Sequence, residues 1–229
     1  MSARQGVNLA RHTLLRVDPR CWPRIRERTA AHAEDLAQWA VRGWPLIVRR
    51  YLPHEERQII PVAAPLPPTA AQGRRAGVVL GLLEEEVLHT IDVVTLPAAL
   101  AAAPVAWQPA MHALISLGEE CASVPALYGS LLWQLLTGMS YVTARSDLDL
   151  CWRVDSARQA QSLTEGLARI ERVSPMRLDG ELLLPDGGAI AWREYVSAAA
   201  DPGLRDELLV KTLHGVDSRP RAWLFRQAG

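Results

Sequence analysis

The clearest pattern of hydrophobic and polar positions lies in the second half of the chain, between Asp147 and Val154. Polar and apolar side chains alternate there, which predicts a strand with successive side chains on opposite faces. Asp147 and Asp149 would share one face, with Cys151 and Arg153 further along it. The other face, directed toward a core, would carry Leu148, Leu150 and Trp152. We therefore expect a strand that presents two carboxylates at one end and buries its apolar side.

The same kind of periodicity predicts strands mixed with helices over the rest of the chain. Candidate strands cover residues 12–17, 45–51, 58–62, 74–80, 127–128, 177–184 and 189–195, and residues 87–91 form a further candidate segment of regular structure. Candidate helices cover residues 30–39, 107–119, 131–136, 157–173 and 205–213. The last two strands are joined by Pro185-Asp-Gly-Gly188, a strong hairpin signal. This order of elements predicts a mixed sheet with helices packed on it.

A shift in composition suggests two domains. From Thr95 the sequence becomes rich in proline and alanine, which indicates a soft boundary near residues 95–105. We predict a smaller N-terminal α/β domain over residues 1–100 and a larger domain over residues 101–229. The fold class as a whole is α+β.

Composition and charge exclude several classes of function. The 229-residue chain is 49% hydrophobic, enough for a sizeable core, and its formal net charge is zero. A neutral chain has no global field to steer it to nucleic acid or to a membrane surface, and no apolar run approaches the ~20 residues of a membrane span. Its three cysteines, Cys21, Cys121 and Cys151, show neither paired nor zinc-binding spacing, so we expect a reducing, cytoplasmic setting.

Two neighbouring features point to metal and phosphate chemistry. Asp147 and Asp149 are two residues apart at a predicted strand edge, and such carboxylates suit Mg²⁺ together with substrate phosphates. Gly129 and Ser130 precede a predicted helix, where backbone N–H groups and a hydroxyl can bind an anion. Each feature alone also has an ordinary structural interpretation, because Asp, Gly and Ser favour turns and strand ends. Together they predict a site for a metal-bound phosphate substrate.

These motifs resemble those of a known superfamily. Gly129-Ser130 followed by Asp147-Leu-Asp149 is similar to the signature of the nucleotidyltransferases, which have the DNA polymerase β-like fold. More closely, the run YGSLLWQLLTG…SDLDL resembles the phosphoribosyl-dephospho-CoA transferases, which act as malonate decarboxylase holo-acyl-carrier-protein synthase. The segments HTLLRVDP, WPLIVRR, PLPP and DGELLLPDGGAIAWRE…ELLVKTLHGV carry the same resemblance, which extends from His12 to about Val216.

The resemblance implies a nucleotidyltransferase fold and a specific reaction. The donor would be triphosphoribosyl-dephospho-CoA, and the acceptor would be a serine of the apo acyl carrier subunit of malonate decarboxylase. The serine hydroxyl would attack the α-phosphorus, and pyrophosphate would leave. A two-metal Mg²⁺ site held by Asp147 and Asp149 would neutralise charge on the phosphoryl oxygens.

The resemblance also implies further site residues. A third carboxylate is expected on a neighbouring strand, to hold a second metal or to take the proton of the attacking hydroxyl. Its candidates are Asp179, which we prefer although Asp179-Gly180 also suits a turn, and then Glu181 and Glu194. Gly129 and Ser130 would approach the triphosphate. Further possible phosphate partners are Lys211, Arg49, Arg50 and Arg193.

Two other functions fit the same motifs. One is another nucleotidyltransferase, which would move a nucleoside monophosphate to a small molecule or a protein. The other is a non-catalytic module of the same fold that binds a carrier protein or a decarboxylase subunit. The presence of both Asp147 and Asp149 argues against the second.

Overall fold

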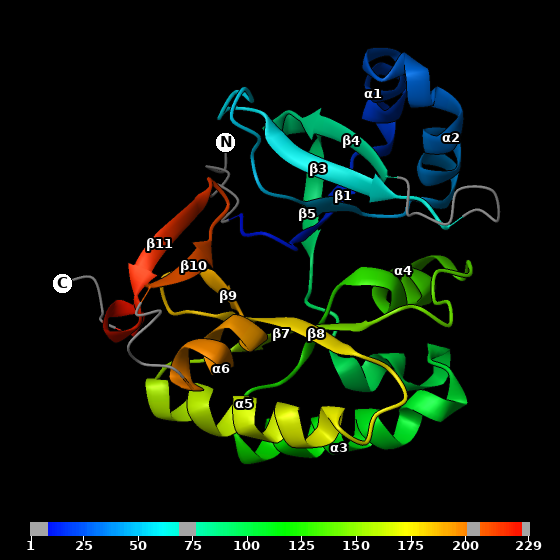
Figure 1. Cartoon of the computed structure of the whole chain (residues 1–229). Helices are drawn as coiled ribbons and strands as arrows, with labels where there is room; N and C mark the ends of the chain where they lie inside the picture. Colours follow the sequence, from blue (N-terminus) through cyan, green and yellow to red (C-terminus); the bar gives the residue numbers. More distant parts are fainter. Residues whose placement is uncertain (1–8, 69–76, 201–206, 226–229) are drawn as a thin grey trace. The chain divides into compact units, whose positions relative to one another are not determined.

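The chain forms two compact units (Figure 1). The computed structural model describes residues 9–68, 77–200 and 207–225. The first unit contains the described residues up to Val93 together with Leu213–Gly215, and the second contains Val94–Thr212 and the described residues from Val216 onward. Each unit combines one sheet with helices, so the α+β class predicted from the sequence is confirmed.

The first unit is a five-stranded sheet with two α-helices. The strand order is β4-β3-β2-β1-β5. The strands are β1 (Leu14–Val17), β2 (Leu46–Val48), β3 (Ile60–Pro65), β4 (Gly77–Leu82) and β5 (Val87–Ile91). The helices are α1 (Trp22–Arg28) and α2 (Ala33–Arg42), with short 3-10 turns η1 (Pro19–Cys21), η2 (Ala30–His32) and η3 (Glu84–Glu86). The predicted strand at 74–80 is thus observed from Gly77, and its residues 74–76 lie outside the described part of the chain.

Strand pairing in the first unit differs from the predicted α/β arrangement. Every pair in this sheet is antiparallel. Neighbours in the chain, β2 with β3 and β3 with β4, pair directly and run in opposite directions, whereas an α/β unit pairs parallel strands across a helix.

The first unit also includes the short segment Leu213–Gly215, because Tyr51 N donates to Leu213 O (2.9 Å) and the Tyr51 ring stacks on His214.

The second unit is built on a six-stranded mixed sheet in the order β11-β10-β9-β8-β7-β6. The strands are β6 (Ala126–Leu127), β7 (Leu148–Arg153), β8 (Leu178–Leu183), β9 (Ala189–Ala191), β10 (Glu207–Lys211) and β11 (Val216–Pro220). The helices are α3 (Gln108–Glu120), α4 (Gly129–Thr137), α5 (Ala157–Glu171) and α6 (Trp192–Ala200), with 3-10 turns η4 (Leu96–Ala102), η5 (Val105–Trp107) and η6 (Arg221–Trp223). β7 and β8 are parallel and are joined through α5; the other strand pairs of this sheet are antiparallel.

Helices define the two faces of the second sheet. Helices α3, α5 and α6 lie on one face, whereas α4 lies on the other side of β7 (Figure 1). Trp152 of β7 contacts α3 at Gly118, so the apolar side of β7 faces these helices. Leu148, Leu150 and Trp152 are all 0–1% exposed, which confirms the face predicted from the alternation. The residues between them on β7 therefore point to the face where α4 begins.

Local signals explain where the elements around β7 begin and end. Ser156 is the N-cap of α5, and its Oγ accepts a hydrogen bond from Gln159 N (3.2 Å), as its sequence position predicts. Helix α4 ends at Thr137, and Gly138 is its C-cap residue with a left-handed backbone. The hairpin between β8 and β9 is also observed, with Leu184 N donating to Gly188 O (2.8 Å).

Two predicted elements near the C-terminus are wrong. The predicted strand at 189–195 ends at Ala191, and Trp192–Ala200 is helix α6. Its buried residues Trp192, Tyr195 and Ala198 recur every three residues, which suits a helix packed on one side. Within the predicted helix at 205–213, Glu207–Lys211 is the strand β10, in which Leu208 and Val210 are buried and Leu209 between them is exposed. Residues 205 and 206 lie outside the described residues.

Among the described helices, none combines the length and the apolar character needed to cross a membrane.

Candidate active site

The face of the second sheet opposite α3 and α5 carries a row of acidic side chains. In the parallel pair β7·β8, Asp149 lies directly opposite Asp179, and Cys151 lies opposite Glu181. Side chains of register partners point to the same face, and neighbouring strands are about 4.8 Å apart. Asp149 and Asp179 are partly exposed, so their carboxylates can both reach one ligand. The Gly180 N–H donates to Asp179 Oδ1 (2.9 Å) inside β8, so Asp179-Gly180 belongs to a strand and not to a turn.

Gly129 packs directly against Asp149. A Cβ at Gly129 would lie 1.8 Å from Asp149 Oδ2 and 2.4 Å from its Cγ, so only a glycine leaves room for the carboxylate. Its φ of 70° also lies in the left-handed region, where other residues are strained. The adjacent Tyr128 N donates to Asp149 O (3.2 Å). The predicted Gly129-Ser130 motif therefore meets the predicted carboxylate strand at Asp149.

The start of α4 offers donors on the same side. Ser130 is 1% exposed, and among the described residues its Oγ has no hydrogen-bond partner. The N-cap residue Tyr128 makes no side-chain capping bond, so the first N–H groups of this nine-residue helix are not satisfied by a cap. Exposed N–H groups at a helix start attract anions. A buried hydroxyl beside them adds a further polar group for such a ligand.

Asp147 lies just before the strand and not in it. It is partly exposed and, within the described residues, its carboxylate makes no hydrogen bond or ion pair. Because β7 begins at Leu148, Asp147 is two residues from Asp149 at the end of the strand where Asp179 also lies. The structure therefore places Gly129, Ser130, Asp149 and Asp179 at this end of the sheet, and Asp147 precedes Asp149 by two residues in the chain.

Tyr128 also faces this acidic surface, although its position in the sequence does not mark it as a functional residue. Burial raises the pKa of the Tyr128 phenol, and negative charge at Cys151, Asp149, Glu181 and Asp179 raises it further. The phenol thus remains a proton donor at neutral pH. Antiparallel pairing of Ala126 with Cys151 and of Leu127 with Leu150 carries Tyr128 to the position beside Asp149. Only this pairing reveals its place, since an aromatic residue before Gly129 reads equally well as part of a core.

The two weaker candidates for the third carboxylate have other partners. Glu181 is 4% exposed and accepts a hydrogen bond from Lys211 Nζ (3.0 Å). Glu194 lies on α6 and accepts a hydrogen bond from Leu209 N (2.7 Å). Asp179 differs from both because it lies opposite Asp149 and, among the described residues, its carboxylate bonds only to the neighbouring Gly180 N–H.

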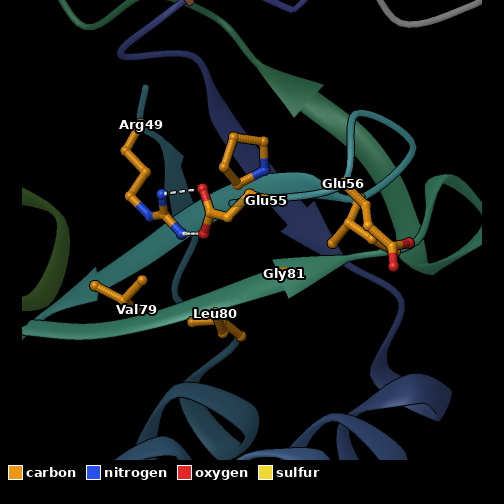
Figure 2. A pocket seen from close by; sticks show the side chains of 8 residues that line it. Arg49, Glu55, Glu56, Val79, Leu80 and Gly81 are labelled. Carbon is orange, nitrogen blue, oxygen red and sulfur yellow. Dashed lines mark hydrogen bonds and ion pairs between the residues drawn. The ribbon is translucent and has the colours of Figure 1, made fainter. Parts of the chain in front are cut away.

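The arginines considered as phosphate partners differ in their surroundings. Arg49 belongs to the first unit, where it contacts both carboxylate oxygens of Glu55 (Figure 2) and donates to the carbonyls of Val62 and Arg50. This pair lines a pocket over β3 and β4. The hydrogen bond from Arg49 lowers the pKa of Glu55 to about 2. These side-chain partners of Arg49 all belong to the first unit, so they account for its position without a phosphate ligand.

Arg50 is exposed and also belongs to the first unit. Neither Arg49 nor Arg50 therefore shares a unit with Asp149 and Asp179, which belong to the second. In the second unit, Arg193 contacts both carboxylate oxygens of Glu171 and donates to Leu178 O (2.8 Å), which ties α6 to the end of α5.

The fold and site together define a two-unit α+β protein whose second unit bears carboxylates beside a glycine-serine helix start. Comparison with known proteins agrees with this division. Residues 95–222 match the family model described as phosphoribosyl-dephospho-CoA transferase MdcG C-terminal domain, and residues 10–82 match the corresponding N-terminal domain.

Curated relatives carry the same description. A phosphoribosyl-dephospho-CoA transferase of Bradyrhizobium diazoefficiens is 39% identical over 211 residues, covering 90% of this chain and 88% of the relative. Proteins of the same name from Xanthomonas campestris pv. campestris and Xanthomonas euvesicatoria pv. vesicatoria are 36% and 37% identical, covering 83% of this chain and 85% of each relative. The chain belongs to the phosphoribosyl-dephospho-CoA transferase family. No solved structure matches it significantly.

Proposed function

We propose that this protein transfers phosphoribosyl-dephospho-CoA from its triphosphate donor to a serine of the apo acyl carrier subunit of malonate decarboxylase. The proposal includes a nucleotidyltransferase site with Mg²⁺ at Asp147 and Asp149, and with Asp179 as the third carboxylate. Family membership supports the group that is transferred. The observation that carries the site is the in-register pair of Asp149 and Asp179 with Gly129 packed against it.

The residues present fit a bound divalent cation. Asp149 and Asp179 lie next to each other, and carboxylate oxygens are the ligands that Mg²⁺ prefers. Gly129 leaves Asp149 in place where any side chain would displace it. When bound, Mg²⁺ would neutralise charge on the phosphoryl oxygens. Asp147 and Asp149 would hold it, and Asp179 would accept the proton of the attacking hydroxyl.

The chain's own groups suffice to position the reactants. The serine oxygen of the carrier forms a bond to the α-phosphorus, the bond from that phosphorus to the pyrophosphate oxygen breaks, and the serine proton passes to Asp179. The Ser130 hydroxyl and the uncapped N–H groups of α4 bind the phosphate oxygens. Such a transfer needs mainly orientation and neutralisation of charge, which this arrangement supplies.

Intact mass spectrometry of the apo acyl carrier subunit tests the proposal. The carrier is incubated with this protein, triphosphoribosyl-dephospho-CoA and Mg²⁺, and a parallel sample contains a metal chelator. We expect a metal-dependent gain of one phosphoribosyl-dephospho-CoA unit. Asp149→Asn and Asp179→Asn should each lower the rate about 100-fold or more while thermal melting shows an intact fold.

Asp155→Asn is the matched control, since Asp155 is an exposed acid beyond the opposite end of the same strand, and its variant should transfer normally. Substantial transfer by Asp149→Asn would overturn the site. Consumption of an ordinary nucleoside triphosphate in place of the proposed donor would support a nucleotidyltransferase reaction but reject triphosphoribosyl-dephospho-CoA as its substrate. Absence of any triphosphate binding would support a carrier-binding module without catalysis.

A further inference from the structure

A second charged pair lies on the same face of the sheet as Asp149 and Asp179. Glu181 follows Asp179 by two residues on β8, so both side chains point to this face, about 7 Å apart along the strand. The Glu181 side chain is 5% exposed and the Lys211 side chain is 35% exposed, with 3.0 Å between Lys211 Nζ and Glu181 Oε1. The buried member is thus the acid, and the cation reaches the surface.

Small residues on β9 make this pair possible. Ala189 pairs with Lys211 on β10, and Ala191 pairs with Glu181 on β8. Register partners share a face, so the two alanines lie between the lysine and the glutamate. Their short side chains leave room for the four-carbon stem of Lys211 to cross β9. The geometry of three strands therefore fixes the ammonium beside the acidic row.

The choice of lysine at this position is unusual for the chain. Lys211 is the only lysine among 25 basic residues. Some arginines in this protein contact both carboxylate oxygens of an acid, as Arg28 does with Glu86 and Arg49 does with Glu55. The Lys211 ammonium makes one bond to Glu181, and among the described residues its side chain makes no other hydrogen bond. An ammonium has three N–H donors, so two remain for a ligand.

Stability alone gives a weak reason for such a pair. Removing two charges from water costs about as much as their attraction returns, so an apolar pair at these positions would stabilise the fold as well. A partly exposed cation beside a phosphate site has a clear use, because it attracts the anion that the acidic row would repel.

We propose that Lys211, oriented by Glu181, binds the leaving pyrophosphate end of the triphosphate donor. This inference rests on the proposed function for the nature of the donor. Lys211 keeps its proton throughout and donates N–H bonds to the oxygens of the departing pyrophosphate. Glu181 is then a positioning residue that holds the ammonium and is not a metal ligand. The spacing of about 7 Å between Asp179 and Glu181 along β8 is similar to the length of a triphosphate chain.

Binding of inorganic tripolyphosphate and steady-state kinetics test this assignment in the full chain. Calorimetry with tripolyphosphate and Mg²⁺ needs neither the natural donor nor the carrier. We expect Lys211→Met to weaken tripolyphosphate binding, and to raise the donor KM and the pyrophosphate inhibition constant, by about tenfold to hundredfold. The KM for the acyl carrier should not change. Lys211→Arg should restore most of the loss, because it keeps the charge.

Glu181→Gln separates positioning from metal binding. It should weaken tripolyphosphate binding by about threefold to tenfold and leave the Mg²⁺ concentration for half-maximal transfer unchanged, whereas Asp147→Asn should raise that concentration. Arg219→Met is the matched control, because Arg219 on β11 is also ion-paired, with Asp186, and should not affect binding. If Lys211→Met unfolds because the buried Glu181 loses its ion pair with Lys211, the double variant Glu181→Gln/Lys211→Met removes both charges and provides the same comparison.

The outcomes separate this inference from the proposed function. Equal tripolyphosphate binding by the wild type and the double variant would overturn the inference, even if carrier modification proceeds. A raised Mg²⁺ requirement in Glu181→Gln would overturn the positioning role. Lys211-dependent tripolyphosphate binding without carrier modification would sustain the phosphate site and reject the proposed acceptor.

Discussion

At the scale of single residues, the candidate site depends on a contact between Gly129 and Asp149 that leaves no room for a side chain at position 129. Gly129 and Asp149 approach so closely that a methyl group would overlap the aspartate Cγ and Cβ as well as its terminal oxygen. The whole aspartate side chain would have to move, since rotation of the carboxylate alone does not relieve the overlap. The glycine therefore determines where the carboxylate lies.

Gly129→Ala should remove transfer without unfolding the protein. We expect at least a 100-fold loss of rate, because Asp149 is displaced from its position beside Asp179. The backbone also becomes strained at a φ of 70°, which costs about 1–2 kcal/mol of stability. The measurements are the carrier mass assay and thermal melting of the same preparations.

Gly138→Ala is the control for backbone strain. Gly138 has a φ of 73°, but nothing lies within 4 Å of a Cβ built there. Its variant should lose a similar amount of stability and keep normal transfer. If both variants lose activity equally, backbone strain in α4 and not the overlap with Asp149 is the cause.

At the scale of elements, the parallel pair β7·β8 brings the acids together. The connection through α5 allows the two strands to run in the same direction. In this parallel pair Asp149 lies opposite Asp179, and two residues further on Cys151 lies opposite Glu181. Gly180 lies within this pair, and a Cβ there would meet Leu150 O at 2.2 Å. This neighbour is backbone of a central strand and cannot move aside without breaking the ladder.

Gly180→Ala should therefore destabilise the protein by about 2–4 kcal/mol through forced separation of β7 and β8. Chemical denaturation monitored by tryptophan fluorescence measures the free energy of unfolding. Gly77→Ala, at the start of β4, places its Cβ at an ordinary 3.8 Å from the nearest atom and should leave stability unchanged or slightly raised. Equal stability of the two variants would contradict the close approach at Gly180.

At the scale of the whole molecule, both units rely on carboxylates held by arginines. Glu55 and Glu86 lie in the first unit, and Glu171 and Asp186 lie in the second. The hydrogen bond from Arg49 lowers the pKa of Glu55 to about 2. Burial acts to raise the pKa of the other three, but hydrogen bonds from arginines and backbone N–H groups outweigh it, so each of these pKa values is also lowered.

Acid should therefore destabilise both units. A carboxyl whose pKa is lower in the folded state contributes stability that is complete above its unfolded pKa of about 4.3 and is lost as the pH falls toward the folded value. The melting temperature should change little between pH 7 and pH 5 and should fall from about pH 4.5 downward. Glu55→Gln should have a lower melting temperature at pH 7 and a shallower decline in acid. A melting temperature that stays constant down to pH 3 would contradict these roles.

Much of the second unit could be predicted from local sequence. Alternation around Asp149 predicts the strand and its buried face, and periodicity after Ser156 predicts α5. The turn at Gly187-Gly188 predicts the hairpin. These signals concern residues near each other in the chain, for which the side-chain period and the turn chemistry are set by backbone geometry. The predictions for 189–195 and 205–213 failed because short apolar runs fit either period until their burial is known.

The sequence by itself determined that Asp147 and Asp149 stand at the start of a strand with Gly129-Ser130 upstream, and the resemblance linked these residues to a family. Only the tertiary structure decided which acid lies beside Asp149, because the register of β7 with β8 depends on how α5 packs against the sheet. It likewise paired Lys211 with Glu181 across β9. Contacts between strands depend on pairing and burial of residues far apart in the chain, and no local pattern carries that information.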